Sequence, residues 1–168
     1  KNLNLLNTAI LILYEGGRAV TVYPHLLGTF YRSIEDSLEE IVNYGPSRAL
    51  ESRGILENPI CKILADDPAI LGAGLKTMGT EVSTSTGSID LLLKDDKGTW
   101  VVVEVETRAG DFAVAQVCRL AAGYSKDSRV ELDKVRRVIV CRSFEKNLIE
   151  TARSAGVQLY RIDLVKEA

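Results

Sequence analysis

One segment, residues 87–108, constrains what this chain can fold into more than any other. Its sequence, GSIDLLLKDDKGTWVVVEVETR, consists of two apolar runs that are interrupted by acidic residues. Asp90 interrupts the first run, and Glu104 and Glu106 interrupt the second. Burying a carboxylate is costly unless the group is paired or holds a metal ion. Any fold for this segment therefore has to account for its acids.

The segment predicts a strand over 88–94, a tight turn over 95–98 and a second strand over 99–107. Residues two apart in a strand share a face, so Glu104 and Glu106 point the same way, and pairing across the turn brings Asp90 beside them. Oxygen ligands without His or Cys favour Mg²⁺ or Mn²⁺, with the Val105 carbonyl as a neutral ligand. The alternative is a solvated hairpin whose acids form surface salt bridges.

The bulk composition is that of a globular protein. The chain has 168 residues, of which 46% are hydrophobic and 26% charged, and this length predicts one domain with a small appendage. The formal net charge is −2, so the chain has no overall basic character. Contact with a nucleic acid would have to rely on a local basic patch.

The cysteines and the single histidine argue against zinc and disulfides. Cys61, Cys118 and Cys141 are widely spaced, odd in number and without a C-x-x-C pair, and His25 has no companion ligand. Cys118 and Cys141 sit in apolar patterns, so we expect these two to fill the core, and we expect the protein to be cytoplasmic, in a reducing compartment. The apolar run over 8–14 is too short to span a membrane, so we expect no membrane partner.

The N-terminal part predicts a separate small element over 1–45. Strands over 9–14 and 18–23 flank a Glu-Gly-Gly turn, Pro24 ends the second strand, and a helix runs from Ser33 to the Gly-Pro pair after residue 44. Such a hairpin suits either dimerisation or covering a sheet edge. The remaining residues, 46–168, form the main domain.

In the main domain, Asn58 as cap and Pro59 at the first helical position predict a helix start. A strand is expected before the hairpin, and a helix, a strand, a helix and a strand after it, over 81–86, 112–123, 135–141, 144–155 and 157–164. The order is αβββαβ with an additional helix and strand. It predicts an α/β fold with a central mixed sheet flanked by helices.

The same residues resemble the core of the PD-(D/E)XK nuclease superfamily, and the match is closest to the nuclease domain of NucS/EndoMS-type endonucleases. The matching motifs, within about residues 55–165, are Glu57, Leu64-Ala65-Asp66-Asp67-Pro68, Gly87-Ser88-Ile89-Asp90-Leu91-Leu92, Val101-Val102-Val103-Glu104-Val105-Glu106 and Ala115-Gln116-Val117. The resemblance implies a restriction-endonuclease-like fold and Mg²⁺- or Mn²⁺-dependent hydrolysis of phosphodiester bonds in DNA. Branched, mismatched or duplex DNA would be the substrate, with a role in repair or recombination and a homodimer as the assembly.

By this resemblance Asp90 and Glu104 are metal ligands, Glu57 is the acid carried on the helix, and Gln116 orients water or a phosphate. Glu39 and Glu40 are the fallback candidates for the helix acid. Glu106 stands where the family has a lysine, and is expected to act as a third ligand or as the base that orients water. Leu120 stands where the family has a tyrosine, and Tyr124 lies one helical turn further on.

Basic residues on and after the second strand are the candidates for DNA contact. Arg108 lies two residues after Glu106 and offers a replacement for the missing lysine, and the further candidates are Arg119, Lys126 and Arg129. Acids are interleaved with the basic residues after position 125, which is equally typical of a solvated surface.

Three functions stay open at this point. The first is a metal-dependent DNA endonuclease. The second, suggested by Glu106 and Leu120, is a nuclease fold that binds DNA without cutting it. The third is an assembly subunit that dimerises through the N-terminal hairpin.

Overall fold

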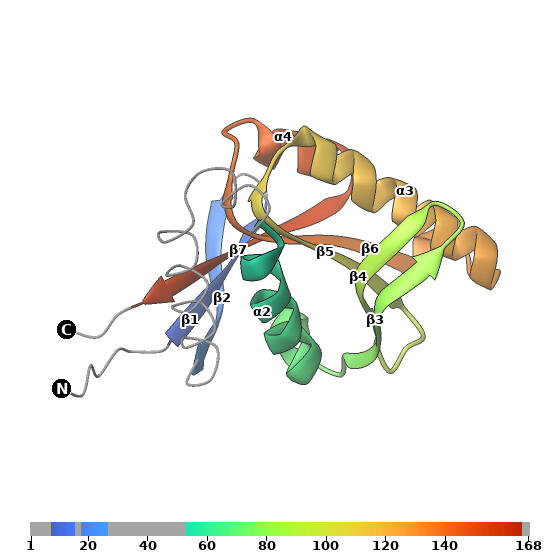
Figure 1. Ribbon diagram of the computed structural model, residues 1–168, viewed down its shortest axis with the longest axis horizontal. Coiled ribbons are helices and arrows are strands. Elements are labelled where there is room, and N and C mark those ends of the chain that lie inside the picture. The colour runs from blue at the N-terminus through green and yellow to red at the C-terminus, as the bar shows by residue number, and fades with distance from the viewer. Residues whose placement is uncertain (1–7, 16–17, 27–52, 166–168) are drawn as a thin grey trace.

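The computed structural model describes residues 8–15, 18–26 and 53–165, and it describes side chains from 60 to 162. Figure 1 shows the arrangement of the elements. In chain order they are β1 (Thr8–Glu15), β2 (Arg18–Leu26), α2 (Arg53–Asp66), the 3₁₀ turn η1 (Pro68–Leu71), β3 (Lys76–Thr84), β4 (Gly87–Lys94), β5 (Trp100–Ala109), α3 (Asp111–Ser128), the 3₁₀ turn η2 (Leu132–Lys134), β6 (Val135–Phe144), α4 (Leu148–Ser154) and β7 (Val157–Val165).

The strands form one mixed sheet in the order β2-β1-β7-β6-β5-β4-β3. The pairs β5–β6 and β6–β7 are parallel, and the pairs β1–β2, β1–β7, β3–β4 and β4–β5 are antiparallel. Parallel neighbours need a crossover connection, and α3 and α4 provide these crossovers. The order from α2 to β6 confirms the predicted αβββαβ core.

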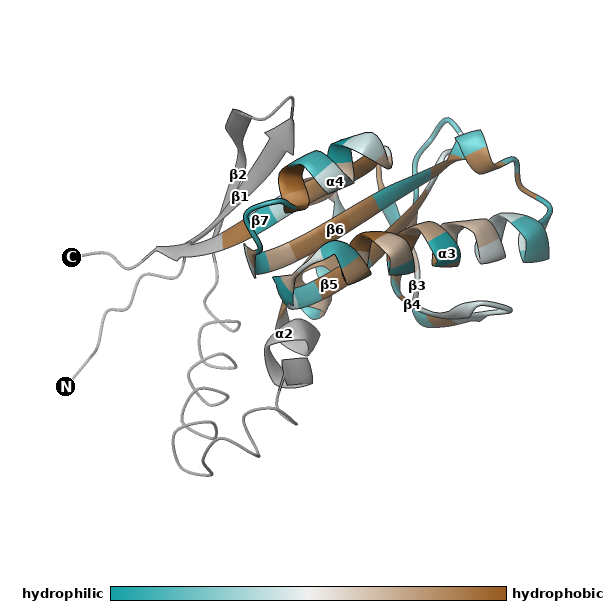
Figure 2. Cartoon of the chain, turned by 90° about the horizontal axis from the view of Figure 1, so that it is seen from above, coloured by the Kyte–Doolittle hydropathy of each residue, from teal (hydrophilic) through white to brown (hydrophobic). Residues whose placement is uncertain are grey.

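Both faces of the sheet are buried, which explains the nearly continuous apolar runs of β5 and β6. Val101 and Val103 of β5 pack against Ile60 and Leu64 of α2 on one face. Val102 packs on the opposite face with residues of α3 and α4. Figure 2 shows β6 as hydrophobic along its middle and hydrophilic toward its ends. The result is a three-layer arrangement with β5 and β6 at its centre.

The turn between β4 and β5 forms where the sequence predicted it. The carboxylate of Asp95 accepts hydrogen bonds from the amides of Lys97 (2.9 Å) and Thr99 (2.8 Å). These bonds, with that of Thr99 first, lower the pKa of Asp95. Gly98 takes a positive φ of 85°, a conformation that glycine adopts without a steric penalty. The turn fixes which residues of β4 and β5 lie opposite each other.

The tip of the β3–β4 hairpin is fastened to α3. Asp127 of α3 accepts hydrogen bonds from the amide (2.7 Å) and the hydroxyl (2.8 Å) of Ser85. Thr86 donates a hydrogen bond to the carbonyl of Arg119 (2.9 Å). A Cβ atom at Gly123 would collide with the Thr86 side chain, so this close approach requires glycine.

Several element boundaries differ from the sequence prediction. Helix α2 begins at Arg53 rather than after Asn58, so Pro59 lies inside it; the packing of Ile60 and Leu64 offsets the hydrogen bond that a proline cannot make. Strand β3 ends at Thr84, before the two residues of the turn, and not at residue 86. The predicted start at residue 81 missed the first five residues of β3, 76–80, which include a bulge between Thr77 and Gly79.

Three further boundaries moved because of tertiary contacts. Helix α3 continues past Gly123 to Ser128, because the ring of Tyr124 packs at 5.2 Å on Trp100. Strand β6 continues to Phe144 because it keeps pairing with β5, which delays the start of α4 to Leu148.

The N-terminal strands extend the sheet beyond β7, and β2 is its outermost strand there. The sequence placed the end of this strand at Pro24, whereas β2 continues to Leu26 with Pro24 paired to Ile10. An outermost strand tolerates a proline because one of its two edges lacks a neighbouring strand. The helix predicted from Ser33, with Glu39 and Glu40, lies outside the described residues. No helix in the described part of the chain has the length and hydrophobicity to cross a membrane.

Candidate active site

The central strands part at the acids of the segment 87–108. β4 and β5 pair from Lys94 opposite Trp100 to Leu91 opposite Val103, and no further pair between them follows. Beyond this point β4 stays paired with β3, while β5 stays paired with β6. We call this separation the fork. The next residues on the two strands are Asp90 and Glu104.

Two side chains bridge the fork. Oδ2 of Asp90 accepts a hydrogen bond from the amide of Val105 at 2.9 Å, and Oε1 of Glu104 accepts one from the amide of Asp90 at 3.4 Å. Each carboxylate thus takes a backbone donor of the opposite strand that the ladder no longer uses. The predicted proximity of Asp90 and Glu104 is therefore present in the structure.

The two carboxylates are desolvated to different degrees. Among residues 60–162, Glu104 is the one charged residue that is buried, with 2% of its surface exposed. Asp90 is half-buried. Desolvation raises the pKa of Asp90 above its ordinary value, against the lowering effect of its hydrogen bonds with Val105 and Glu104, and Glu81 adds to the rise. An apolar site that keeps two acids adjacent favours a cation between them.

A cleft of about 370 Å³ opens onto Asp90. Helix α2 forms one wall and the β3–β4 hairpin the other, and the lining residues are Cys61, Lys62, Ala65, Asp66, Thr80, Glu81, Asp90 and Val105. Asp90 and Val105 line the cleft and also take part in the fork, whereas Glu104 does not line the cleft. The fork and the cleft are therefore adjacent parts of one site.

The donor set at the fork fits a hard divalent cation. It consists of two carboxylates and the backbone of Val105, and magnesium needs only one or two carboxylates because water and substrate phosphate complete its shell. No group of three or more His, Cys, Asp or Glu residues with metal-binding geometry occurs in the described part of the chain. Zinc sites are usually built from His and Cys, and the fork has neither.

Glu106, Gln116 and Glu57 lie on three different elements. Glu106 is half-buried on β5 and is in register with Cys141 of β6. Burial raises the pKa of Cys141 to about 12, while Arg161 lowers it and Glu106 raises it; both residues are in register with Cys141 in the sheet. Gln116 is half-buried in α3. Glu57 lies in α2, four residues before Cys61 of the cleft wall.

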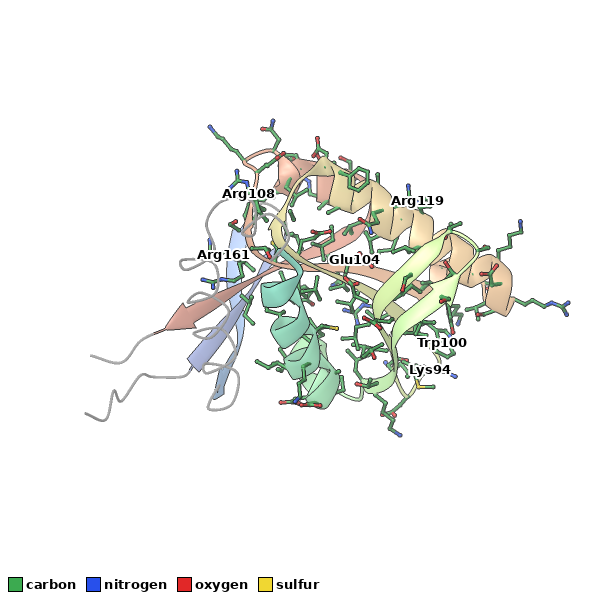
Figure 3. The ribbon with its side chains drawn as sticks, in the orientation of Figure 1. Lys94, Trp100, Glu104, Arg108, Arg119 and Arg161 are labelled. Carbon is green, nitrogen blue, oxygen red and sulfur yellow. The ribbon has the colours of Figure 1, made fainter. Side chains whose placement is uncertain are left out.

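The four basic candidates are all exposed. Arg108 follows the fork on β5, and Arg119 lies in the middle of α3. In Figure 3 these two lie on either side of Glu104. Lys126 lies in the last turn of α3, and Arg129 caps that helix with a left-handed backbone. None of the four lines the cleft.

Sequence reasoning missed Lys62 and Glu81 of the cleft. A signal for Lys62 was present, because the helical period of Ile60 and Leu64 places residue 62 off the buried stripe of α2. Glu81 lies in β3 between the residues that pair with Ile89 and Leu91, next to Asp90 in the ladder, and its φ is +50°. Because the sequence predicted a strand that begins at residue 81, it did not indicate that Glu81 lies beside Asp90 in the pairing of β3 with β4.

The αβββαβ core with two carboxylates at a fork defines the chain as a restriction-endonuclease-like α/β protein. The family model described as "Endonuclease NucS C-terminal domain" matches residues 56–168. The chain belongs to this family, as the sequence motifs predicted.

Individual relatives agree with this assignment. Endonuclease NucS of Methanocaldococcus jannaschii is 24% identical over 107 residues, which is 64% of this chain and 40% of that protein. Endonuclease NucS of Mycolicibacterium gilvum is 29% identical over 154 residues, which is 90% of this chain and 68% of that protein. The chain spans 40% and 41% of the relatives from M. jannaschii and Methanopyrus kandleri.

Two solved structures share the fold. An EndoMS–dsDNA complex matches with a TM-score of 0.56 and 23% identity, covering 64% of this chain and 44% of that one. A repair endonuclease from Pyrococcus abyssi also matches with a TM-score of 0.56, at 21% identity, covering 63% of this chain and 46% of that one.

Proposed function

We propose that this protein is a Mg²⁺- or Mn²⁺-dependent endonuclease that hydrolyses phosphodiester bonds in DNA. The observation that carries the proposal is the pairing of Asp90 and Glu104 at the fork, beside the cleft. Membership in the NucS family supports the reaction class. Because the chain spans less than half of several relatives, the activity of the whole protein is part of the proposal.

The residues at and around the fork would have different roles in this reaction. Asp90 and Glu104 would hold the cation, with the Val105 carbonyl as a neutral ligand. When bound, the cation supplies a water of lowered pKa and neutralises the charge that builds up on the phosphate. Glu106 would orient the attacking water. Glu57, on α2, and Gln116, on α3, would bind metal-bound water and a phosphate oxygen.

DNA is the substrate that the comparisons favour. One of the solved structures with the same fold is a complex with double-stranded DNA, and another is a repair endonuclease. The net charge of −2 means that contact must be local. Arg108, Arg119, Lys126 and Arg129 are exposed and would contact phosphates.

The test is cleavage of plasmid, branched and mismatched DNA with Mg²⁺ or Mn²⁺ by the wild type and by Asp90→Ala. We expect the wild type to cleave DNA and a chelator to inhibit it. We expect Asp90→Ala to show no cleavage. The control is Asp133→Ala, which removes an exposed acid of η2 and should keep its activity. Cleavage that survives Asp90→Ala would remove the assignment.

A second function, DNA binding without cleavage, is favoured by one observation. Glu106 occupies the position of the family's lysine, so the charge beside the fork is inverted. This function predicts salt-sensitive DNA binding that is unchanged in Asp90→Ala, and no binding of Mn²⁺. Mn²⁺ titration followed by electron paramagnetic resonance separates the two functions without relying on cleavage.

The proposal includes a homodimer and a role in repair or recombination. Sedimentation velocity of the full chain over a range of concentrations tests the assembly, with a single monomeric species as the contrary result. Comparison of mismatched and branched DNA with matched duplex tests the role, because a repair nuclease should cut the irregular substrates faster.

A further inference from the structure

In a phosphodiesterase site built from acids, a cation from the protein beside the metal assists the reaction. The scissile phosphate is an anion, and its charge grows in the transition state, so fixed positive groups stabilise it. At the fork the position that would carry this group holds Glu106. The described residues of the cleft include three acids: Asp66, Glu81 and Asp90.

Lys62 is the one lysine or arginine among the described residues that line the cleft. It projects from the α2 wall, next to Cys61, whose thiol donates a 3.5 Å hydrogen bond to the carbonyl of Asp90. Lys62 is exposed, and within residues 60–162 no carboxylate lies at ion-pair distance from its ammonium group. The charge is therefore available to an anion in the cleft.

Other cations near the sheet are occupied or lie elsewhere. Arg136 is held by Gln158 through two hydrogen bonds of 2.9 and 2.6 Å, and Lys94 lies 4.6 Å from the ring centre of Trp100. Arg161 lies on β7, separated from Glu106 on β5 by Cys141 of β6. Arg108, which the sequence offered as a replacement, does not line the cleft.

We propose that Lys62 supplies the catalytic cation that Glu106 cannot, from α2 instead of from β5. This inference rests on the proposed nuclease function. The flexible four-carbon stem of lysine carries the ammonium into the cleft, where it would contact a non-bridging oxygen of a phosphate bound beside Asp90. Asp90 and Glu104 would act on that phosphate through the metal ion they hold, while Lys62 would act on it directly from α2.

The experiment measures single-turnover cleavage and, separately, DNA affinity without divalent metal ions. We expect Lys62→Met, which keeps the apolar stem, to slow cleavage by about 10²–10³-fold, the range for removing one transition-state donor. Its metal-free affinity for DNA, read by fluorescence anisotropy, should stay within about twofold of wild type. Lys97→Met, on the exposed β4–β5 turn, is the matched control.

A rescue variant distinguishes a catalytic charge from a structural one. Glu106→Lys returns a cation to β5, so we expect it to restore cleavage at least about tenfold in the Lys62→Met background, a gain that has to exceed the loss of the water-orienting carboxylate. A merely structural role for Lys62 would not respond to a charge placed on another element. Circular dichroism confirms that each variant is folded.

Two results overturn the inference while leaving the proposed function intact. One is wild-type cleavage by Lys62→Met alongside inactive Asp90→Ala. The other is a loss of cleavage that equals the loss of DNA affinity and is not rescued, which would make Lys62 a binding residue only. Absence of cleavage by the wild type itself would overturn the proposed function, and this inference with it.

Discussion

The main-chain amide of Val105 donates a 2.9 Å hydrogen bond to Oδ2 of Asp90, a residue on a strand with which Val105 no longer pairs. The bond replaces a ladder bond that the parting strands cannot make. A carboxylate proposed to bind metal therefore also satisfies a buried backbone donor, since Val105 is 2% exposed. This dual role makes the stability of the fold depend on the chemistry of the site.

The first prediction separates the two roles of Asp90. Asp90→Ala leaves the Val105 amide without its acceptor, so we expect a loss of about 1–3 kcal/mol in the free energy of unfolding. Asp90→Asn keeps an oxygen acceptor and should lose less than about 1 kcal/mol. Urea unfolding followed by circular dichroism measures both. Equal destabilisation by the two substitutions would show that the hydrogen bond contributes nothing.

The second prediction concerns the cost of the buried acid. Glu104 is buried and lies beside Asp90, so Glu104→Gln removes a desolvated ionisable group while keeping an oxygen for the amide of Asp90. We expect the metal-free variant to be more stable than wild type by about 1 kcal/mol at neutral pH, and to be inactive. Thermal unfolding with a chelator present measures the stability. A destabilised variant would contradict this.

The third prediction follows from the clamp between Ser85 and Asp127. Hydrogen bonds from Ser85 lower the pKa of Asp127, so its carboxylate stays ionised below the ordinary value of 3.8. For a lowered pKa the stabilisation is fully present above the unfolded value and is lost as pH falls through the folded value. An NMR titration should show the Ser85 amide signal moving with Asp127 below pH 3.8.

A matched variant tests the clamp at neutral pH. Asp127→Ala should accelerate hydrogen exchange of the Ser85 amide, because its acceptor is removed, and leave exchange in the β4–β5 turn unchanged. The amide of Thr99, bound to Asp95 in that turn, is the internal reference. Equal acceleration at both amides would indicate general destabilisation.

The fourth prediction addresses DNA binding. Removing the charge of Arg119 or Lys126 should weaken DNA binding uniformly across sequences, and lower the slope of log K against log salt by about 0.9 for each phosphate that the protein no longer neutralises. Arg153→Ala is the control, because Arg153 already forms a 2.9 Å ion pair with Glu150. Anisotropy titrations at several salt concentrations supply the slopes. An unchanged slope in Arg119→Ala would remove that residue from the interface.

The parts of the fold that follow local rules were predictable from the sequence. The turn at Asp95 has a sequence that favours one backbone geometry, and it set the register that brings Asp90 to Glu104. The apolar runs of β5 and β6 are also a local pattern, and they predicted buried strands. Cys141 is buried in the core and Cys118 packs against it half-buried, as their apolar neighbours predicted.

The parts that depend on distant residues were not predictable. Gly123 looked like a helix end, but its missing side chain serves the approach of Thr86, and α3 continues. Pro59 looked like a helix start, but packing carries α2 across it. The fork itself has no local signal, because the end of pairing between β4 and β5 depends on where β3 and β6 lead each strand.

The β3–β4 hairpin is anchored at both of its ends. Residues 91–94 of β4 hold its base to β5, and Asp127 and the backbone of α3 hold its tip. The wall of the cleft opposite α2 is consequently set when the chain folds. Little ordering is then left to be done when a phosphate enters, because folding has already met the entropy cost of assembling the site.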